Sequence, residues 1–145
     1  GASLGERMHA VFVDLCRVGY GQVILVGSDI PALTAASIRR VCDVLELDQG
    51  DVALGPVYDG GYYLIGLTRP EEKLFKGISW STASVLRETL AAARQLELRV
   101  HMLDATYDVD IVEDMEHLRR DLADSRSLRA SRPRTYAWMR RCFNT

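Results

Sequence analysis

Cysteine and histidine are scarce in this chain, and their scarcity narrows the kinds of site it can form. The 145 residues include three cysteines and three histidines, all widely spaced. An odd number of scattered cysteines fits neither a disulfide framework nor a zinc site, so Cys16, Cys42 and Cys142 are interpreted as small buried or half-buried thiols. The histidines have no metal-ligand spacing, and we interpret them as scattered structural or surface residues.

Long apolar runs and a strong excess of one charge are also missing. No run approaches the ~20 apolar residues that span a bilayer, and the chain does not open on a charged-then-apolar signal peptide. The net charge of −2 provides no general attraction to nucleic acid or to anionic membranes. We therefore expect a cytoplasmic globular protein without nucleic-acid or membrane partners.

The most informative segment is a short apolar run that leads into a carboxylate. Residues 23–26, Val-Ile-Leu-Val, show no polar alternation, which predicts a strand buried on both faces of a parallel sheet. Pro31 cannot donate a ladder hydrogen bond and so ends this extended segment. Ligands of open α/β sheets bind beyond the carboxyl ends of the strands, so Asp29 is placed for a metal ion or a phosphate-bearing substrate. The alternative is that Asp29 only caps a turn.

Local signals predict further helices and strands along the chain. Residues with capping side chains mark the helix starts, and these are Ser3 with Glu6 in a capping box, Thr34, Ser81 or Thr82, and the acids around Asp110. Strands are expected over residues 52–54, 62–67 and 100–103, and an Asp-Gly-Gly turn separates the first two. This alternation of helices and strands predicts an α/β fold.

The C-terminal segment has a composition of its own. From Ser125 onward the chain has six arginines interleaved with three aromatic residues. Such interleaving occurs in nucleic-acid-binding segments, but a short helix that lays its aromatics on the core and its arginines in water is the better interpretation. We therefore expect an α/β domain over residues 1–124 and a basic-aromatic helix or tail over residues 125–145 that packs on it.

Three carboxylates follow predicted strands at what should be one edge of the sheet: Asp29, Asp59 and Asp110. Mg²⁺ and Mn²⁺ prefer oxygen ligands and are commonly held by one or two carboxylates together with substrate phosphates. Two aspartates are therefore enough for a site that handles nucleotides. A metal ion there would neutralise charge on a diphosphate during nucleotidyl or glycosyl transfer.

These segments closely resemble a family of bacterial glycosyltransferase-like proteins with the GT-A (nucleotide-diphospho-sugar transferase) fold. The family is related to the guanylyltransferases that act on 2-phospholactate or phosphoenolpyruvate. The Asp-Gly-Gly-Tyr-Tyr-Leu-Ile-Gly string is the most specific element, and the matching segments are residues 4–8, 27–31, 54–56, 59–67, 80–82 and 108–114. The resemblance implies an open, doubly wound, mostly parallel sheet with helices on both faces.

The resemblance also implies roles for individual residues. Asp29 and Asp110 would hold the metal, and Asp59 would face the acceptor or sugar as a general base. The residues implied to bind the nucleotide or the substrate are Leu4, Gly5, Glu6, Arg7, Ser28, Gly60, Gly61, Tyr62, Trp80 and Thr82. Glu6 has a second interpretation, since it also completes the capping box with Ser3.

Two departures from the family pattern bear on activity. The family normally begins with a strand and a phosphate-gripping loop, and this sequence starts after them, so we expect an N-terminally truncated version of the fold. Relatives tend to have Thr-Pro where this chain has Ile111 and Val112, so Asp110 is expected to serve as the helix cap instead.

Two hypotheses of function remain. The first is a metal-dependent glycosyltransferase or nucleotidyltransferase that acts on a nucleotide-activated small molecule and is impaired by the absent loop. The second is a non-catalytic binding or oligomerisation module that keeps the scaffold. A phospho-aspartate phosphatase is disfavoured, because Pro31 stands where that chemistry needs a second acid. An incomplete sheet edge also predicts a homodimer.

Overall fold

The computed structural model describes residues 2–143 and divides the chain into two compact units. The sheet unit comprises Gly1–Ser28 and Leu33–Thr106. The helical unit comprises Asp29–Ala32 and Tyr107–Thr145. Each unit is described below by itself.

The sheet unit contains a four-stranded mixed sheet in the order β1-β3-β2-β4. Its strands are β1 (Val23–Val26), β2 (Val52–Pro56), β3 (Tyr62–Leu67) and β4 (Val100–Met102). Strand β3 is antiparallel to both β1 and β2, whereas β4 is parallel to β2, so three strands share one direction. The short Asp-Gly-Gly turn forces β2 and β3 into an antiparallel hairpin, while longer connections through helices return the other strands in parallel. The α/β fold class is confirmed.

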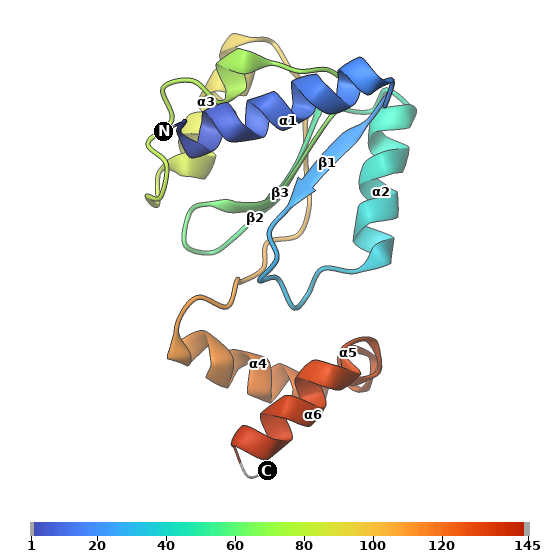
Figure 1. The fold of residues 1–145 in the computed structure, drawn as a ribbon, viewed down its shortest axis with the longest axis vertical. Coiled ribbons are helices and arrows are strands. Elements are labelled where there is room, and N and C mark those ends of the chain that lie inside the picture. Colours follow the sequence, from blue (N-terminus) through green and yellow to red (C-terminus); the bar gives the residue numbers. More distant parts are fainter. Residues whose placement is uncertain (1, 144–145) are drawn as a thin grey trace. The chain divides into compact units, whose positions relative to one another are not determined.

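Helices cover both faces of this sheet (Figure 1). Helices α1 (Leu4–Val18) and α3 (Val85–Gln95) share one apolar core with the strands, and Phe12, Leu54 and Ile65 are among its most buried members. On the other face α2 (Ala35–Glu46) packs so closely that a Cβ on Gly66 would meet a Val41 methyl at 2.9 Å. A short 3-10 helix, η1 (Glu72–Leu74), precedes α3.

The predicted caps of the first two helices are confirmed. The Ser3 amide donates to a Glu6 carboxylate oxygen at 2.6 Å and the Glu6 amide donates to Ser3 Oγ at 3.2 Å, which is a complete capping box. Gly19 ends α1 at a φ of 109°, a conformation that favours glycine. Thr34 Oγ1 accepts from the Ser37 amide at 3.0 Å and caps α2.

The predicted start of the third helix is wrong. Helix α3 begins at Val85, and neither Ser81 nor Thr82 caps it. Ser81 has a φ of 62°, and the Thr82 hydroxyl donates back to the Ser79 carbonyl at 2.7 Å. Thr82 thus closes a turn of its own, and Glu88 accepts the Ser79 amide from within α3 at 2.7 Å.

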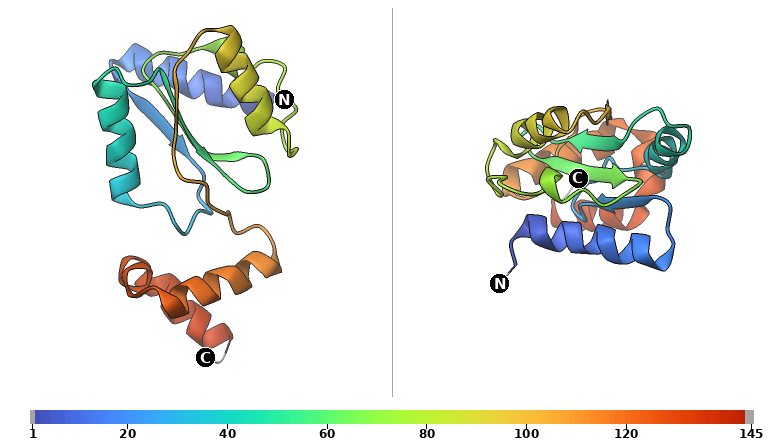
Figure 2. Two further views of the ribbon diagram at one scale, coloured as in Figure 1. Left: turned by 180° about the vertical axis from the view of Figure 1, so that it is seen from behind. Right: turned by 90° about the horizontal axis from the view of Figure 1, so that it is seen from above.

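The helical unit has a small core of its own. Helices α4 (Val112–Asp124), α5 (Arg126–Ser131) and α6 (Pro133–Cys142), drawn in orange and red in Figure 2, pack on one another. Leu118, Leu122 and Met139 are buried at its centre, with Tyr136 and Phe143 packed against them. The arginine-rich segment is helical as predicted, and Trp138 is exposed.

The unit boundary differs from the division expected at residue 124. Helix α4 shares its apolar core with α6, so it groups with the C-terminal segment and not with the sheet. Cys142 is exposed, whereas Cys16 and Cys42 are half-buried as predicted. Over residues 2–143, none of the helices combines the length and the apolar character needed to cross a membrane.

Candidate functional site

The parallel strands β1, β2 and β4 bring their carboxyl ends to one edge of the sheet. The chain after β4 continues beside the end of β2, where the Tyr58 amide donates to the Thr106 carbonyl at 3.0 Å and the Thr106 amide donates to the Pro56 carbonyl at 3.1 Å. The Tyr58 hydroxyl adds a bond to the Ala105 carbonyl at 3.2 Å. Hydrogen bonds to backbone carbonyls therefore hold the segment after β4 beside the end of β2 at this edge of the sheet unit.

The structure brings the segments of two predicted metal ligands together within the helical unit. The Val109 amide donates to the Asp29 carbonyl at 3.0 Å, and Asp110 is the next residue. The side chains of Asp29 and Asp110 are both exposed. Segments 80 residues apart in sequence thus meet through one backbone hydrogen bond, next to two carboxylates that solvent can reach.

Few side chains of the described residues are grouped as metal ligands. Among residues 2–143 the structure contains no group of three His, Cys, Asp or Glu side chains arranged to hold an ion. Mg²⁺ and Mn²⁺ need fewer protein ligands, because water and substrate phosphates complete their coordination. Asp29 and Asp110 are two exposed carboxylates, and we treat them as candidate ligands for such an ion.

The expectation that Asp110 caps the following helix is wrong. Asp114 caps α4 instead, because its Oδ2 accepts hydrogen bonds from the amides of Asp110 at 3.1 Å and Ile111 at 3.0 Å. A carboxylate in the first turn also interacts favourably with the positive end of the helix dipole. The start of α4 is thereby capped from within the helix, and the Asp110 carboxylate is not used as the cap.

Asp59 lies in the sheet unit, in the tight turn between β2 and β3. Its Oδ1 accepts the Gly61 amide at 2.9 Å, and the side chain is otherwise exposed. Gly60 has a φ of 97°, and its carbonyl accepts the Leu86 amide at 2.8 Å. The turn is therefore held rigidly at the start of α3, with one carboxylate oxygen occupied by the backbone.

The first turn of α1 borders a hollow of about 380 Å³ in the sheet unit. Three residues of the predicted substrate set line it, namely Gly5, Glu6 and Trp80. Gly5 is required for this packing, since a Cβ there would lie 2.6 Å from the Phe75 carbonyl oxygen and 2.7 Å from Trp80 Nε1. An apolar wall with a few polar groups at this volume is typical of a small-molecule site.

Sequence reasoning missed most of the residues that line this hollow, among them two with side chains that can be cationic. His9 and Lys76 also line it, with the His9 ring 6.1 Å from that of Phe75. His9 could have been found from its spacing, because it lies three residues after Glu6 and so on the same helix face. Lys76 had no such signal, since its loop reaches α1 only through the tertiary fold.

The remaining predicted residues lie in different surroundings. The ring of Tyr62 meets that of Trp80 edge to face at 6.4 Å, and its buried hydroxyl has a raised pKa because burial disfavours the charged form. Thr89 lies close enough to lower that pKa slightly, but the two hydroxyls do not reach hydrogen-bond geometry. Tyr62 thus packs against Trp80. The other predicted residues are exposed or line the turn, and these are Leu4, Arg7, Ser28, Gly61 and Thr82.

The substitution Glu6→Gln distinguishes a helix-capping role of the Glu6 side chain from a ligand-binding role. Gln also accepts the Ser3 amide, so we expect the thermal midpoint at pH 7 to stay nearly unchanged. The Ser3 hydrogen bonds lower the pKa of Glu6 from its ordinary 4.5, so the carboxylate stabilises α1 above that pH and loses this effect as pH falls through the lowered pKa. Thermal melts against pH should therefore show a weaker acid dependence in the variant. A loss of nucleotide affinity of more than about tenfold would instead mark Glu6 as a ligand-binding residue.

The fold is an α/β fold of the nucleotide-diphospho-sugar transferase type. The chain belongs to a bacterial family described as "Uncharacterized protein conserved in bacteria (DUF2064)", whose model matches residues 1–82. The crystal structure of a proposed nucleotide-diphospho-sugar transferase from Desulfovibrio desulfuricans is similar, with 32% sequence identity and a TM-score of 0.80. The similarity covers 96% of this chain and 63% of that one, so this chain spans 63% of its relative's length. No curated protein matches the chain.

Proposed function

We propose that this chain is a transferase domain that uses Mg²⁺ or Mn²⁺ to act on a nucleotide-activated small molecule, by glycosyl or nucleotidyl transfer. The observation that carries the proposal is the hydrogen bond from the Val109 amide to the Asp29 carbonyl, which joins the segments of the two proposed metal ligands. The similarity to the Desulfovibrio desulfuricans protein supports the substrate class. Neither observation depends on the other.

In this proposal different residues of the chain have different roles. Asp29 and Asp110 hold the cation, which when bound would offset the charge of a diphosphate. Within the sheet unit, the hollow beside α1 is a second candidate ligand site, with the Trp80 ring as an apolar wall and Lys76 among its lining residues. Asp59 keeps Oδ1 on the Gly61 amide, so its other carboxylate oxygen is the one that would accept a proton from the acceptor.

Calorimetric titration tests the proposal directly. Nucleoside diphosphates with different bases are titrated into the protein with Mg²⁺, with Mn²⁺, and with a chelator in place of metal. We expect saturable binding of at least one nucleotide that requires the metal. Binding that is equally tight in chelator would contradict the metal site, and no binding of any nucleotide would contradict the transferase assignment.

One feature favours the second hypothesis, a binding or oligomerisation module. Leu4, Val11 and Val18 are exposed and recur every seven residues, so they form an apolar stripe along one face of α1. Strand β1 is also outermost in the sheet order of the described residues. An exposed stripe beside an outer strand is the kind of surface that a second copy covers.

We predict a homodimer that buries this stripe. Light scattering at tens of micromolar protein should give a dimeric mass, because symmetric pairs are the commonest assembly that covers such a face. Val11→Glu should shift the mass toward the monomer, since it places a charge at the centre of the stripe. The matched control is Val112→Glu, the same change at an exposed position of α4, which should leave the dimer intact.

A monomeric mass for the unaltered protein would refute the dimer. A dimer that binds no nucleotide would favour the module over the transferase. A dimer that also binds nucleotide with metal would fit the transferase, with the apolar stripe serving assembly alone.

A further inference from the structure

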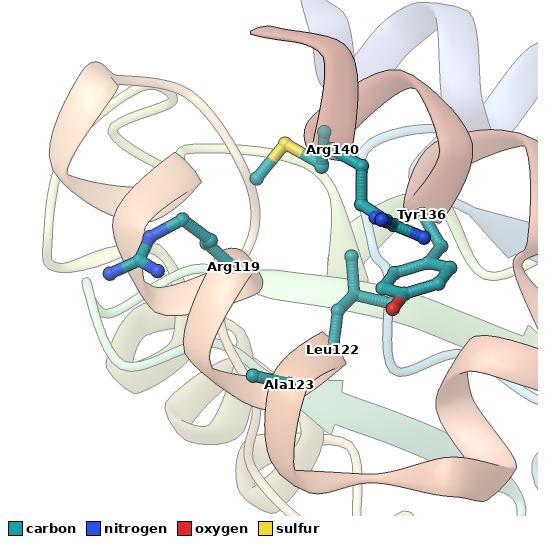
Figure 3. A pocket seen from close by; sticks show the side chains of 6 residues that line it. Arg119, Leu122, Ala123, Tyr136 and Arg140 are labelled. Carbon is teal, nitrogen blue, oxygen red and sulfur yellow. The ribbon is translucent and has the colours of Figure 1, made fainter. Parts of the chain in front are cut away.

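The hollow beside α1 differs from a hollow in the helical unit in how its side chains are held. The hollow in the helical unit, about 360 Å³ in volume, lies between α4 and α6 (Figure 3). It is lined by Arg119 and Arg140, but the Arg119 guanidinium points away from Arg140 and its Nε donates to Glu116 at 2.9 Å. The two guanidinium groups therefore do not face a common ligand. Beside α1, in contrast, the side chain that forms one wall is fixed by contacts outside the hollow.

That wall is the Trp80 side chain, which belongs to a tight loop between η1 and α3. The Trp80 amide donates to the Ile78 carbonyl at 3.0 Å, so the chain turns sharply before the tryptophan. Ser81, the next residue, has a φ of 62°, a conformation that costs energy for a residue with a side chain. Such a conformation persists only where the surrounding structure holds it. The contacts that hold this loop come from α3.

Glu88 of α3 holds the loop on both sides of Trp80 with one carboxylate. Its Oε2 accepts the Ser79 amide at 2.7 Å, and its Oε1 accepts the Ser84 hydroxyl at 2.7 Å. Thr82 adds a link within the loop, because its hydroxyl donates to the Ser79 carbonyl at 2.7 Å. The hydrogen bonds from Ser79 and Ser84 lower the pKa of Glu88, so at neutral pH the carboxylate is ionised and both bonds are charge-assisted.

The loop places the Trp80 indole against the first turn of α1. A Cβ on Gly5 would lie 2.7 Å from Trp80 Nε1, so the indole contacts the helix where glycine leaves room for it. On its other contact the Tyr62 ring meets the indole edge to face at 6.4 Å. The indole remains half-buried and lines the hollow of about 380 Å³. The wall is thus formed before a ligand arrives, and a ligand does not bear the entropic cost of ordering it.

We propose that Glu88 is a positioning residue, which sets the Trp80 indole as a stacking wall for a neutral ring with one flat apolar face and polar edges. Nucleobases and pyranose sugars share this chemistry. The lining residues include the acids Glu6 and Glu72 and the base Lys76, so the hollow does not favour one sign of charge and suits a neutral ring. The proposal rests on the proposed function in treating this hollow as a ligand site, but it needs no metal.

Uncharged probes test the stacking wall in the presence of a chelator. Adenosine, uridine and methyl α-glucopyranoside are titrated into the full chain carrying Trp138→Phe, which leaves Trp80 as its only tryptophan. We expect at least one of the three to bind saturably and to change the Trp80 emission, and the nucleosides and the glycoside distinguish a base from a sugar. Glycerol has hydroxyl groups but no ring and should have no effect. Trp80→Leu keeps an apolar side chain without a flat face and should weaken binding about tenfold or more.

Three variants in the same background test the positioning role. Glu88→Ala removes both contacts to the loop, so we expect about tenfold weaker probe binding together with a red-shifted Trp80 emission. Glu88→Gln keeps an oxygen for the Ser79 amide and an amide group for the Ser84 hydroxyl, so binding should stay within about threefold of the unaltered value. Glu46→Ala makes the same change at an exposed position of α2 and should leave both readings unaltered.

Circular dichroism checks that each variant is folded, and Ser84→Ala, which removes one of the two Glu88 contacts, replaces Glu88→Ala if that variant unfolds. Unchanged binding in the variant that loses the contact, or weaker binding without a change in Trp80 emission, would overturn the positioning role. Metal-dependent nucleotide binding with no effect of any uncharged probe on Trp80 would overturn this inference and leave the proposed transferase intact. Probe binding in chelator beside nucleotide binding that ignores the metal would have the opposite meaning.

Discussion

Asp29→Asn should remove metal-dependent nucleotide binding, with a loss of affinity of about 100-fold or more. A neutral amide is a poor ligand for a hard divalent cation, and a site with only two protein carboxylates cannot replace the lost one. The side chain is exposed, so the thermal midpoint should hardly move. Calorimetry of the nucleotide with Mn²⁺, beside a thermal melt of the same sample, measures both effects.

Two companion variants make this result specific. Asp110→Asn should also weaken the metal-dependent binding while leaving stability unchanged, because Asp114 and not Asp110 accepts the amides at the start of α4. Asp124→Asn removes an exposed carboxylate from the last turn of α4 and should leave metal binding unaltered. Unchanged metal affinity in Asp29→Asn would refute the site, whatever the other two variants did.

Elements governed by neighbours in the sequence could be predicted well. The capping box at Ser3, the glycine at the end of α1 and the cap at Thr34 each depend on residues within one helical turn. The extended conformation of β1 and β3 likewise needed only their own pattern. In these places local chemistry and tertiary structure favour the same conformation, so reading the sequence was sufficient. The prediction that residues 23–26 are buried on both faces of a parallel sheet is wrong, because β1 lies at the sheet edge beside the antiparallel β3 and Val26 is exposed.

Elements governed by distant contacts could not be predicted in the same way. Ser81 and Thr82 have capping side chains, but Glu88 reaches back to the Ser79 amide and Thr82 closes a separate turn, so α3 begins later. The position of β3 between β1 and β2 followed from the hairpin turn together with long-range pairing. The grouping of α4 with α6 depends on contacts between Leu118, Leu122 and Met139, which no periodicity reveals.

The candidate site shows the same difference between what local signals predict and what depends on distant contacts. The choice of the Gly27 to Pro31 segment as a candidate site followed from strand-end chemistry alone, and the structure adds a backbone hydrogen bond from Val109 to Asp29. The hollow beside α1 was foreseen only in Gly5, Glu6 and Trp80, through the family resemblance. The hollow with Arg119 and Arg140 was not foreseen, because its two arginines come from different helices, 21 residues apart.

The rigid turn that carries Asp59 provides the second large effect, expected for Gly60→Ala. Gly60 and Gly19 have similar positive φ angles, 97° and 109°, so alanine is strained to a similar degree at both. They differ in space, because a Cβ on Gly60 would overlap the backbone carbonyl group of Ala83, whereas nothing lies within 4 Å at Gly19. Backbone does not move aside cheaply, so the turn itself must shift.

We expect Gly60→Ala to lower the free energy of unfolding by about 2–4 kcal/mol and Gly19→Ala by only about 1 kcal/mol. Urea titration followed by tryptophan fluorescence measures this, since Trp80 lies in the sheet unit beside Tyr62. Equal destabilisation of the two variants would mean that strain in φ accounts for the whole loss of stability and that Ala83 is not held against the turn. A larger loss in Gly60→Ala would instead show that the Asp59 carboxylate stands on a turn fixed by its contact with the segment before α3.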